Sequence, residues 1–291
     1  MDTKELIKKV RKIEIRTRGL SKHIFSGEYH SAFKGRGIAF SEVREYNYGD
    51  DIRNIDWNVT ARLNHPFIKV FDEERELTVI ILVDLSNSGM YGTRNQFKKE
   101  LIVEICSVLA FSAMLNNDKV GVVFFTNKIE KFIPPKKGKS HILRIIHEII
   151  DFEPQEQKTD LTEPLRFLFN AIKKRSIVFI LSDFLANDFA EPLKITNKKH
   201  DTVAIQIYDQ RESQLPDIGM LYAQDSETGK SSLIDTSRKA VRNQYNNWWI
   251  ERQQYLNTTF KKCNVDVIKI KTDEPYVAPL MNFFKKRGSR R

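Results

Sequence analysis

From Thr78 onward the chain alternates short apolar runs with longer amphipathic segments, and this alternation constrains the fold more than any other feature. A short apolar run suits a buried strand, and apolar residues three and four positions apart suit a covering helix. The predicted strands are Val79–Val83, Val120–Phe125, Ile177–Leu181, Thr202–Ile207 and Val265–Ile270. The predicted helices are about Gln96–Leu115, Ser140–Ile150, Leu161–Lys174, Asp188–Lys198 and Ser237–Lys262. The pattern predicts an α/β domain with a doubly wound, mainly parallel sheet and helices on both faces.

The first 76 residues follow a different pattern, with frequent glycines, short β-like pieces and no long helix after the opening one. We expect residues 1–76 to form a β-rich N-terminal addition packed on the main domain, residues 77–291, rather than an independent fold. A hairpin insertion is predicted near residues 219–235, and a basic tail at Lys285–Arg291.

The first predicted strand ends in the sequence Asp84-Leu85-Ser86-Asn87-Ser88, which places one carboxylate and two hydroxyls at alternate positions. In doubly wound folds, ligands bind beyond the carboxyl ends of the strands. Oxygen ligands of this kind suit Mg²⁺, Mn²⁺ or Ca²⁺. Aspartate and serine are also common at helix N-termini, where they cap backbone N–H groups. The fragment alone therefore leaves both a helix cap and a cation site open.

Two later stretches favour the cation site. Thr159 stands in a loop just before a predicted helix, and Asp183 follows another buried strand, so both are expected at the same crevice. The predicted metal ligands are Asp84, Ser86, Ser88, Thr159 and Asp183. Because most direct ligands would be neutral, the ion would keep affinity for an incoming carboxylate.

This arrangement resembles the metal-ion-dependent adhesion site of von Willebrand factor A domains, whose pattern is D-x-S-x-S, then a threonine, then an aspartate. The resemblance implies that the three hydroxyls bind the ion and that the two aspartates act directly or through water. Mg²⁺ is the expected ion, with Mn²⁺ or Ca²⁺ or an empty site as alternatives. The chain departs from the family at two glycine positions, which are occupied by Lys158 and Phe184.

A second segment, Gly35–Glu74, resembles the hallmark of the bacterial domain of unknown function 58 family. The hallmark positions that it fills are Phe40, Arg44, Tyr46, Gly49, Asp50, Asp51, Arg53, Ile55, Asp56, Trp57, Ala61 and Arg62. Members resemble von Willebrand factor A domains with an N-terminal addition, and they are commonly encoded beside MoxR-type AAA+ ATPases. The resemblance implies a cytoplasmic adaptor or partner of such an ATPase, with other von Willebrand factor A proteins as further partners.

The acids and arginines of this signature are expected to form a charge-paired turn that holds Trp57 inward. The residues assigned to a structural or partner-docking role are Arg44, Asp50, Asp51, Arg53, Asp56, Trp57 and Arg62. We expect Arg53 or Arg62 to pair with a carboxylate, because such pairs add geometric specificity as well as energy. Direct docking of a partner, or catalysis by the carboxylates, is the alternative.

The main functional hypothesis is a non-enzymatic, divalent-metal-dependent protein-interaction module. The net charge of +10 keeps open a binder of nucleic acid or of an anionic surface, although no nucleic-acid motif supports it. A metal-dependent hydrolase would want a second acid at Ser86 or a phosphate-binding glycine-rich sequence, and neither is present. The apolar stretch Leu101–Leu115 is too short for a membrane span, which favours a cytoplasmic protein that partners recruit to the membrane surface.

Overall fold

The computed structural model describes residues 39–72, 77–86, 98–156, 158–186, 188–224 and 231–289, with residues 11, 13–14, 17 and 19–21. The chain divides into two compact units. The smaller comprises Phe33–Leu77, and the larger comprises Met1–Ala32 with Thr78–Arg291. The predicted boundary at residue 76, and the packing of the N-terminal addition on the main domain, stay predictions.

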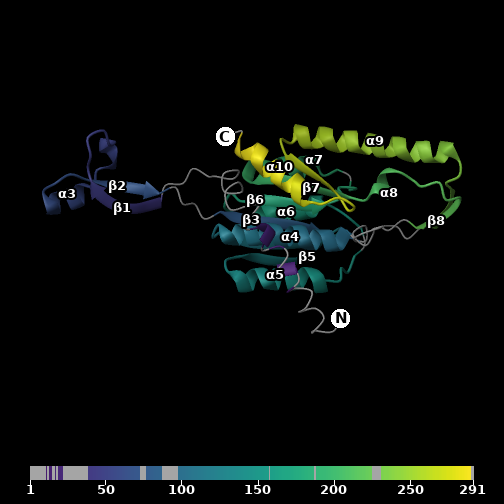
Figure 1. The fold of residues 1–291 in the computed structure, drawn as a ribbon, viewed down its shortest axis with the longest axis horizontal. Coiled ribbons are helices and arrows are strands. Elements are labelled where there is room, and N and C mark those ends of the chain that lie inside the picture. The colour runs from purple at the N-terminus through teal and green to yellow at the C-terminus, as the bar shows by residue number, and fades with distance from the viewer. Residues whose placement is uncertain are drawn as a thin grey trace. The chain divides into compact units, whose positions relative to one another are not determined.

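A six-stranded sheet forms the centre of the larger unit (Figure 1). Its order is β10-β7-β6-β3-β4-β5, and all neighbours are parallel except β4 and β5. The strands are β3 (Thr78–Asp84), β4 (Lys119–Phe125), β5 (Ile129–Lys136), β6 (Ile177–Ser182), β7 (Asp201–Tyr208) and β10 (Asp266–Lys271). The predicted α/β fold with a mainly parallel sheet is confirmed. The unpredicted strand is β5, whose apolar pattern is interrupted by Pro134 and Pro135, which an edge strand tolerates.

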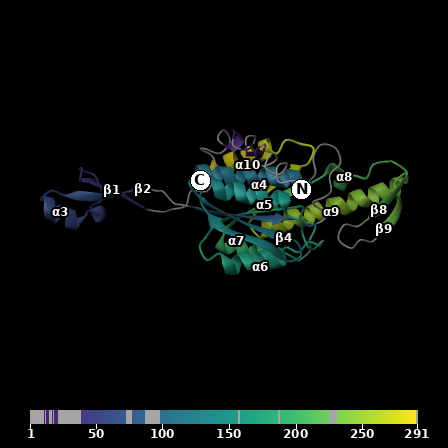
Figure 2. The same ribbon diagram turned by 90° about the horizontal axis from the view of Figure 1, so that it is seen from below.

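Helices cover both faces of this sheet, with α4, α5 and α10 on one face and α6, α7 and α9 on the other (Figure 2). They are α4 (Lys98–Leu115), α5 (Lys139–Asp151), α6 (Thr162–Ala171), α7 (Ala190–Lys199), α8 (Gln210–Ser213), α9 (Lys239–Lys262) and α10 (Val277–Gly288). The hairpin strands are β8 (Met220–Gln224) and β9 (Ser231–Asp235). The basic residues Lys285–Arg287 belong to the last turn of α10 rather than to a tail.

Burial explains why β3 is central. Val79–Val83 have no exposed surface, as expected for an apolar strand covered on both faces. Helix α4 is also apolar on nearly every side and is buried along most of its length. Because β3 and β6 are parallel neighbours, their polar carboxyl-terminal residues emerge at the same edge of the sheet.

The smaller unit contains an antiparallel pair, β1 (Ala39–Glu45) and β2 (Phe67–Asp72). A short 3₁₀ helix, η1 (Ile52–Asn54), and the helix α3 (Trp57–Leu63) lie between these strands in the sequence. Among the described residues of the whole chain, no helix is both long and apolar enough to cross a membrane.

Candidate functional site

Asp84 and Asp183 come together at the carboxyl ends of β3 and β6. The Ser182 hydroxyl donates a hydrogen bond to Asp84 Oδ2 at 2.6 Å, and the Ser86 backbone N–H donates to Asp84 Oδ1 at 3.0 Å. Asp183 Oδ1 accepts a hydrogen bond from the Leu185 N–H at 3.1 Å. Asp84, Ser86 and Asp183 are all buried. The structure thus brings three of the predicted ligands to one edge of the sheet.

The electrostatics of this edge favour an added positive charge. Burial raises the pKa of Asp84 to about 6, and the nearby negative charge of Asp183 contributes to the rise. Hydrogen bonds from Ser182 and Ser86 act in the opposite direction. A cation between the two carboxylates would offset the repulsion that adds to this rise.

Lys98, the first residue of α4, already supplies one positive charge there. Its Nζ donates to Asp183 Oδ2 at 3.0 Å and also pairs with Glu212 of α8. The Lys98 side chain is only 2% exposed. Burial alone would lower the pKa of Lys98, but the charges of Asp183 and Glu212 raise it above its usual value. The ammonium therefore stays charged and neutralises one side of Asp183.

Backbone hydrogen bonds hold the loop that contains Thr159 at the carboxyl ends of the same strands. The Leu85 N–H donates to Phe125 O, and the Asp160 N–H donates to Thr126 O, both at 3.0 Å. These bonds place the loop before α6 at the end of β4, the neighbour of β3. The Thr159 hydroxyl oxygen is buried and makes no hydrogen bond within the described residues. Such a group is costly to bury, so a ligand that satisfied it would be stabilising.

The donor set fits a divalent ion on the Asp84 side of the site. Ser88, the fifth predicted ligand, lies outside the described residues. The other four residues offer two carboxylates and two hydroxyls, the oxygen donors that Mg²⁺, Mn²⁺ and Ca²⁺ prefer. In the part of the chain that is described, no group of three or more His, Cys, Asp or Glu residues could hold a metal, so an ion would depend on the hydroxyls. Lys98 occupies the Asp183 side instead.

Phe184 keeps the backbone conformation that a glycine would adopt at this position. Its φ is 56°, in the left-handed region that bulky side chains rarely enter. The Phe184 ring is fully buried and packs edge-on against Phe260, with ring centroids 5.1 Å apart. The Phe184 N–H also donates to the Ser182 hydroxyl at 3.0 Å. Core packing and this hydrogen bond offset the strain, so replacement of the family glycine leaves the loop in the left-handed conformation.

The acids of the N-terminal signature bond to residues of their own unit. Asp50 forms a two-pronged pair with Arg44, with both N–O distances at 2.8 Å, and it accepts the Asn47 N–H at 2.8 Å. Asp51 caps η1, and Asp56 caps α3. These aspartates therefore order a turn and two helix starts, as capping residues do.

Two expectations for the signature are wrong. Trp57 is 70% exposed rather than buried, because it is the first residue of a short helix whose unit contributes little core. Within the described residues, neither Arg53 nor Arg62 forms an ion pair, and the signature acids pair instead with Arg44 and Lys69. Large apolar side chains are exposed beside Trp57 in the sequence, namely Tyr48, Ile52 and Leu63.

Sequence reasoning missed three residues of the Asp84 site. Ser182 could have been found, because it stands directly before Asp183 at the end of a predicted strand. No sequence pattern indicated Lys98 or Glu212, because Lys98 lies 85 residues from Asp183 and 114 residues from Glu212. A charged residue at the start of a helix usually faces solvent, and only the fold shows that Lys98 does not.

The sequence profile of the family described as "Protein of unknown function DUF58" matches residues 42–255. An uncharacterized protein of Mycobacterium bovis is 26% identical over 292 residues, which cover 99% of this chain and 91% of that protein. An uncharacterized protein of Mycobacterium avium is 28% identical over 53% of this chain and 93% of its own length. Among solved structures, an aerotolerance-related membrane protein from Bacteroides fragilis superposes with a TM-score of 0.50 at 13% identity. That match covers 74% of this chain and 100% of the solved chain, and it supports the fold alone.

Proposed function

The chain belongs to the DUF58 family of proteins of unknown function, and we propose that it is a non-enzymatic protein-interaction module with a divalent cation at the carboxyl ends of β3 and β6. The observation that carries this proposal is the buried, unsatisfied hydroxyl of Thr159 at the sheet edge that holds Asp84 and Asp183. A buried hydroxyl with no partner among the described residues, at the same ends of the strands as two buried carboxylates, is an environment that a hard cation completes.

In this proposal, the chain itself supplies most of the ion's ligands. The hydroxyls of Ser86, Ser88 and Thr159 bind the ion, and Asp84 binds directly or through water. Asp183, which Lys98 already neutralises on one oxygen, acts through water. The bound ion supplies an electrophilic position for a carboxylate of the partner. Lys98 limits the negative charge around the ion and so preserves its affinity for that carboxylate.

The partner that we propose is a MoxR-type AAA+ ATPase, with other von Willebrand factor A proteins as further components, in the cytoplasm or at the membrane surface. The fold shared with an aerotolerance-related protein supports this setting, and family membership agrees with it. Hydrolysis has less support, because the Ser182 hydroxyl beside the carboxylates is committed as a donor to Asp84.

Thermal unfolding with and without metal tests the proposal. Mg²⁺ or Mn²⁺ should stabilise the wild type by about 1.4 kcal/mol when free metal exceeds Kd tenfold. Ser86→Ala should abolish the gain, whereas Ser232→Ala, at an exposed position of β9, should retain it. A parallel pull-down of the purified ATPase should succeed with Mg²⁺ and fail with EDTA. If metal does not change the melting temperature of the wild type, and EDTA does not change ATPase binding, the proposed cation site is ruled out.

A further inference from the structure

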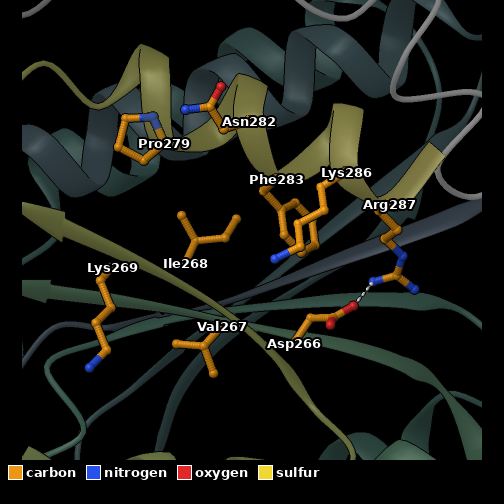
Figure 3. Close-up of a pocket in the computed structure, with 9 residues that line it drawn as sticks. All are labelled: Asp266, Val267, Ile268, Lys269, Pro279, Asn282, Phe283, Lys286 and Arg287. Carbon is orange, nitrogen blue, oxygen red and sulfur yellow. Dashed lines mark hydrogen bonds and ion pairs between the residues drawn. The ribbon is translucent and has the colours of Figure 1, made fainter. Parts of the chain in front are cut away.

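A groove separates strand β10 from helix α10 in the larger unit (Figure 3). Its volume is about 290 Å³, near the lower end of the range for ligand pockets. Asp266, at the start of β10, lines one end, so the groove lies towards the amino ends of the parallel strands. The Asp84 site lies at their carboxyl ends, and the groove is therefore a separate surface.

One wall of the groove is the edge strand of the sheet. Strand β10 stands at the end of the strand order, and within the described residues its only strand partner is β7. Half of the backbone polar groups of such a strand point away from the sheet and can pair with another chain. The strand has six residues, which gives an edge of about 20 Å. That length suits an extended segment of similar size.

The other wall is one face of α10. Pro279, Phe283 and Lys286 are four and three positions apart, so they line the same side of the helix. Leu280 and Phe284 are buried in the core and hold the helix in place. Figure 3 shows the Phe283 and Lys286 side chains directed from α10 toward β10. An added strand would therefore meet an aromatic ring and an ammonium on this side.

The free charges of the groove are positive. Lys269 and Lys286 form no ion pair within the described residues, and Lys269 Nζ donates only to the uncharged Gln253 Oε1, at 2.9 Å. Arg287, in contrast, pairs with Asp266 and Asp201 and ties the end of α10 to the starts of β10 and β7. Within the described residues, two lysines without carboxylate partners therefore lie at a strand edge that no other strand covers, in a chain of net charge +10.

The same lysines disfavour a second copy of this chain as the occupant. Two paired β10 edges would bring Lys269 and Lys286 of one copy close to the same lysines of the other, and such an accumulation of like charge is destabilising. The opposite edge strand, β5, carries Pro134 and Pro135, which cannot donate backbone hydrogen bonds. Charge complementarity therefore points to a different, acidic chain at β10.

We propose that the groove binds an extended acidic segment of a partner protein, which adds to the sheet beside β10 and lies against α10. Backbone hydrogen bonds to β10 provide affinity, and alternate side chains provide specificity. On the α10 side, an apolar residue packs on Phe283 and a carboxylate reaches Lys286. Because side chains alternate along a strand, a carboxylate at a neighbouring position points to the other face and reaches Lys269.

Selection from a phage-displayed library of random peptides on the wild-type protein tests this proposal. We expect the enriched peptides to contain aspartate or glutamate next to an apolar residue. Fluorescence anisotropy of the best synthetic peptide should show binding about tenfold weaker to Lys286→Glu and to Lys269→Glu, because each variant replaces an attraction with a repulsion. Lys136→Glu, an exposed position on the opposite edge strand β5, is the matched control and should bind as the wild type does.

A second arm separates strand addition from charge attraction. Placing proline at the centre of the selected peptide removes a backbone donor and should abolish binding if the peptide pairs with β10. The proposal fails if no acidic peptide is enriched, if Lys136→Glu weakens binding as much as Lys286→Glu, or if the proline peptide binds unchanged. A stable wild-type dimer in gel filtration that Lys269→Glu alters would show instead that a second copy covers β10.

Discussion

Aspartates occur both at the carboxyl ends of β3 and β6 and in the segment between β1 and β2. The two groups differ in how far along the sequence their hydrogen-bond partners lie. In the larger unit, Ser182 and Asp84 are 98 residues apart, and Lys98 and Asp183 are 85 residues apart. In the smaller unit, Arg44 and Asp50 are six residues apart, and the caps of Asp51 and Asp56 span two or three residues.

This difference predicts how much stability each region loses when one partner of a pair is removed. Long-range pairs between buried charges form only when the sheet is complete, and removal of one partner leaves an uncompensated charge in the core. Local pairs at an exposed turn organise a few residues, and water can replace the lost partner. We therefore expect the first region to control global stability and the second to present a recognition surface.

The largest expected effect follows Lys98→Met. The substitution removes the ammonium between the buried Asp183 and Glu212, and loss of one partner of a buried ion pair costs about 3–5 kcal/mol. Urea unfolding measures the loss. Lys99→Met, at the adjacent half-buried lysine that bonds to Phe152 O, is the control and should cost less. If both variants lose the same stability, the buried pairs are not what distinguishes the larger unit.

Metal titration of Lys98→Met tests whether Lys98 and the proposed ion act on the same carboxylate. Without the ammonium, Asp183 has a stronger field for cations, so Mg²⁺ should raise the melting temperature of Lys98→Met more than that of the wild type. An equal rise in both proteins would mean that Lys98 and the ion act at independent positions.

One histidine in each unit allows the units to be compared by pH. Burial lowers the pKa of His200 to about 4, and the positive charges of Lys199 and Arg175 contribute. An unfolded histidine titrates near pH 6.5, so between about pH 6.5 and 4 the unfolded chain binds more protons. Stability should be fully present above this window and fall by up to about 3 kcal/mol as the pH drops through it.

His200→Gln should flatten that part of the stability curve, measured by urea unfolding at several pH values. His65, which is exposed in the smaller unit, provides the matched change, and His65→Gln should leave the curve as it is in the wild type. A pH dependence that follows His65 instead would reverse the assignment of global stability to the larger unit.

Arg44→Gln should have a smaller and local effect. The variant removes both hydrogen bonds to Asp50, which also accepts the Asn47 N–H, so amide exchange should quicken in the Asn47–Asp50 turn. Hydrogen exchange followed by mass spectrometry measures this change, with Arg62→Gln on α3, which forms no ion pair within the described residues, as the control. Slower global refolding or a collapse of the α/β unit would contradict the local role.

Trp57→Ala should have the smallest effect on stability, within about 0.5 kcal/mol, because most of the indole is exposed. If the signature recognises a partner, the same variant should weaken binding of the ATPase in a pull-down. Loss of stability without loss of binding would show that Trp57 supports the fold of its unit rather than a partner.

The sequence predicted the larger unit well because its physics is local and periodic. Strands such as Val79–Val83 are uninterrupted apolar runs, and the parallel arrangement follows from the helices between them. Asp84 and Asp183 could be placed at the same ends of the strands because Asp84 directly follows such a run and Asp183 follows one after a single serine. A strand end fixes the position of the residue after it, whatever happens elsewhere in the chain.

The environments of Lys98 and Trp57 could not be predicted, because they depend on elements that lie far away in the sequence or on the size of the unit. Lys98 sits in a helix whose exposed or buried face is decided by distant elements, and its partner Glu212 lies 114 residues away. For Trp57 the error was the reverse, because a residue expected in the core is exposed. An indole usually indicates a core, but a pair of strands with one short helix has little interior to offer.

The strand order also sets the order in which the chain can assemble during synthesis. Strands β3, β4 and β5 are consecutive in both sequence and space, so they can pair before the second half of the sheet emerges. At about 5–20 residues per second, the 98 residues from Asp84 to Ser182 take roughly 5–20 seconds to translate. Until then Asp84 has no Ser182, and Lys98 has no Asp183. The candidate site is therefore a late product of folding, and a partner that needs it would bind only chains whose β6 has joined β3.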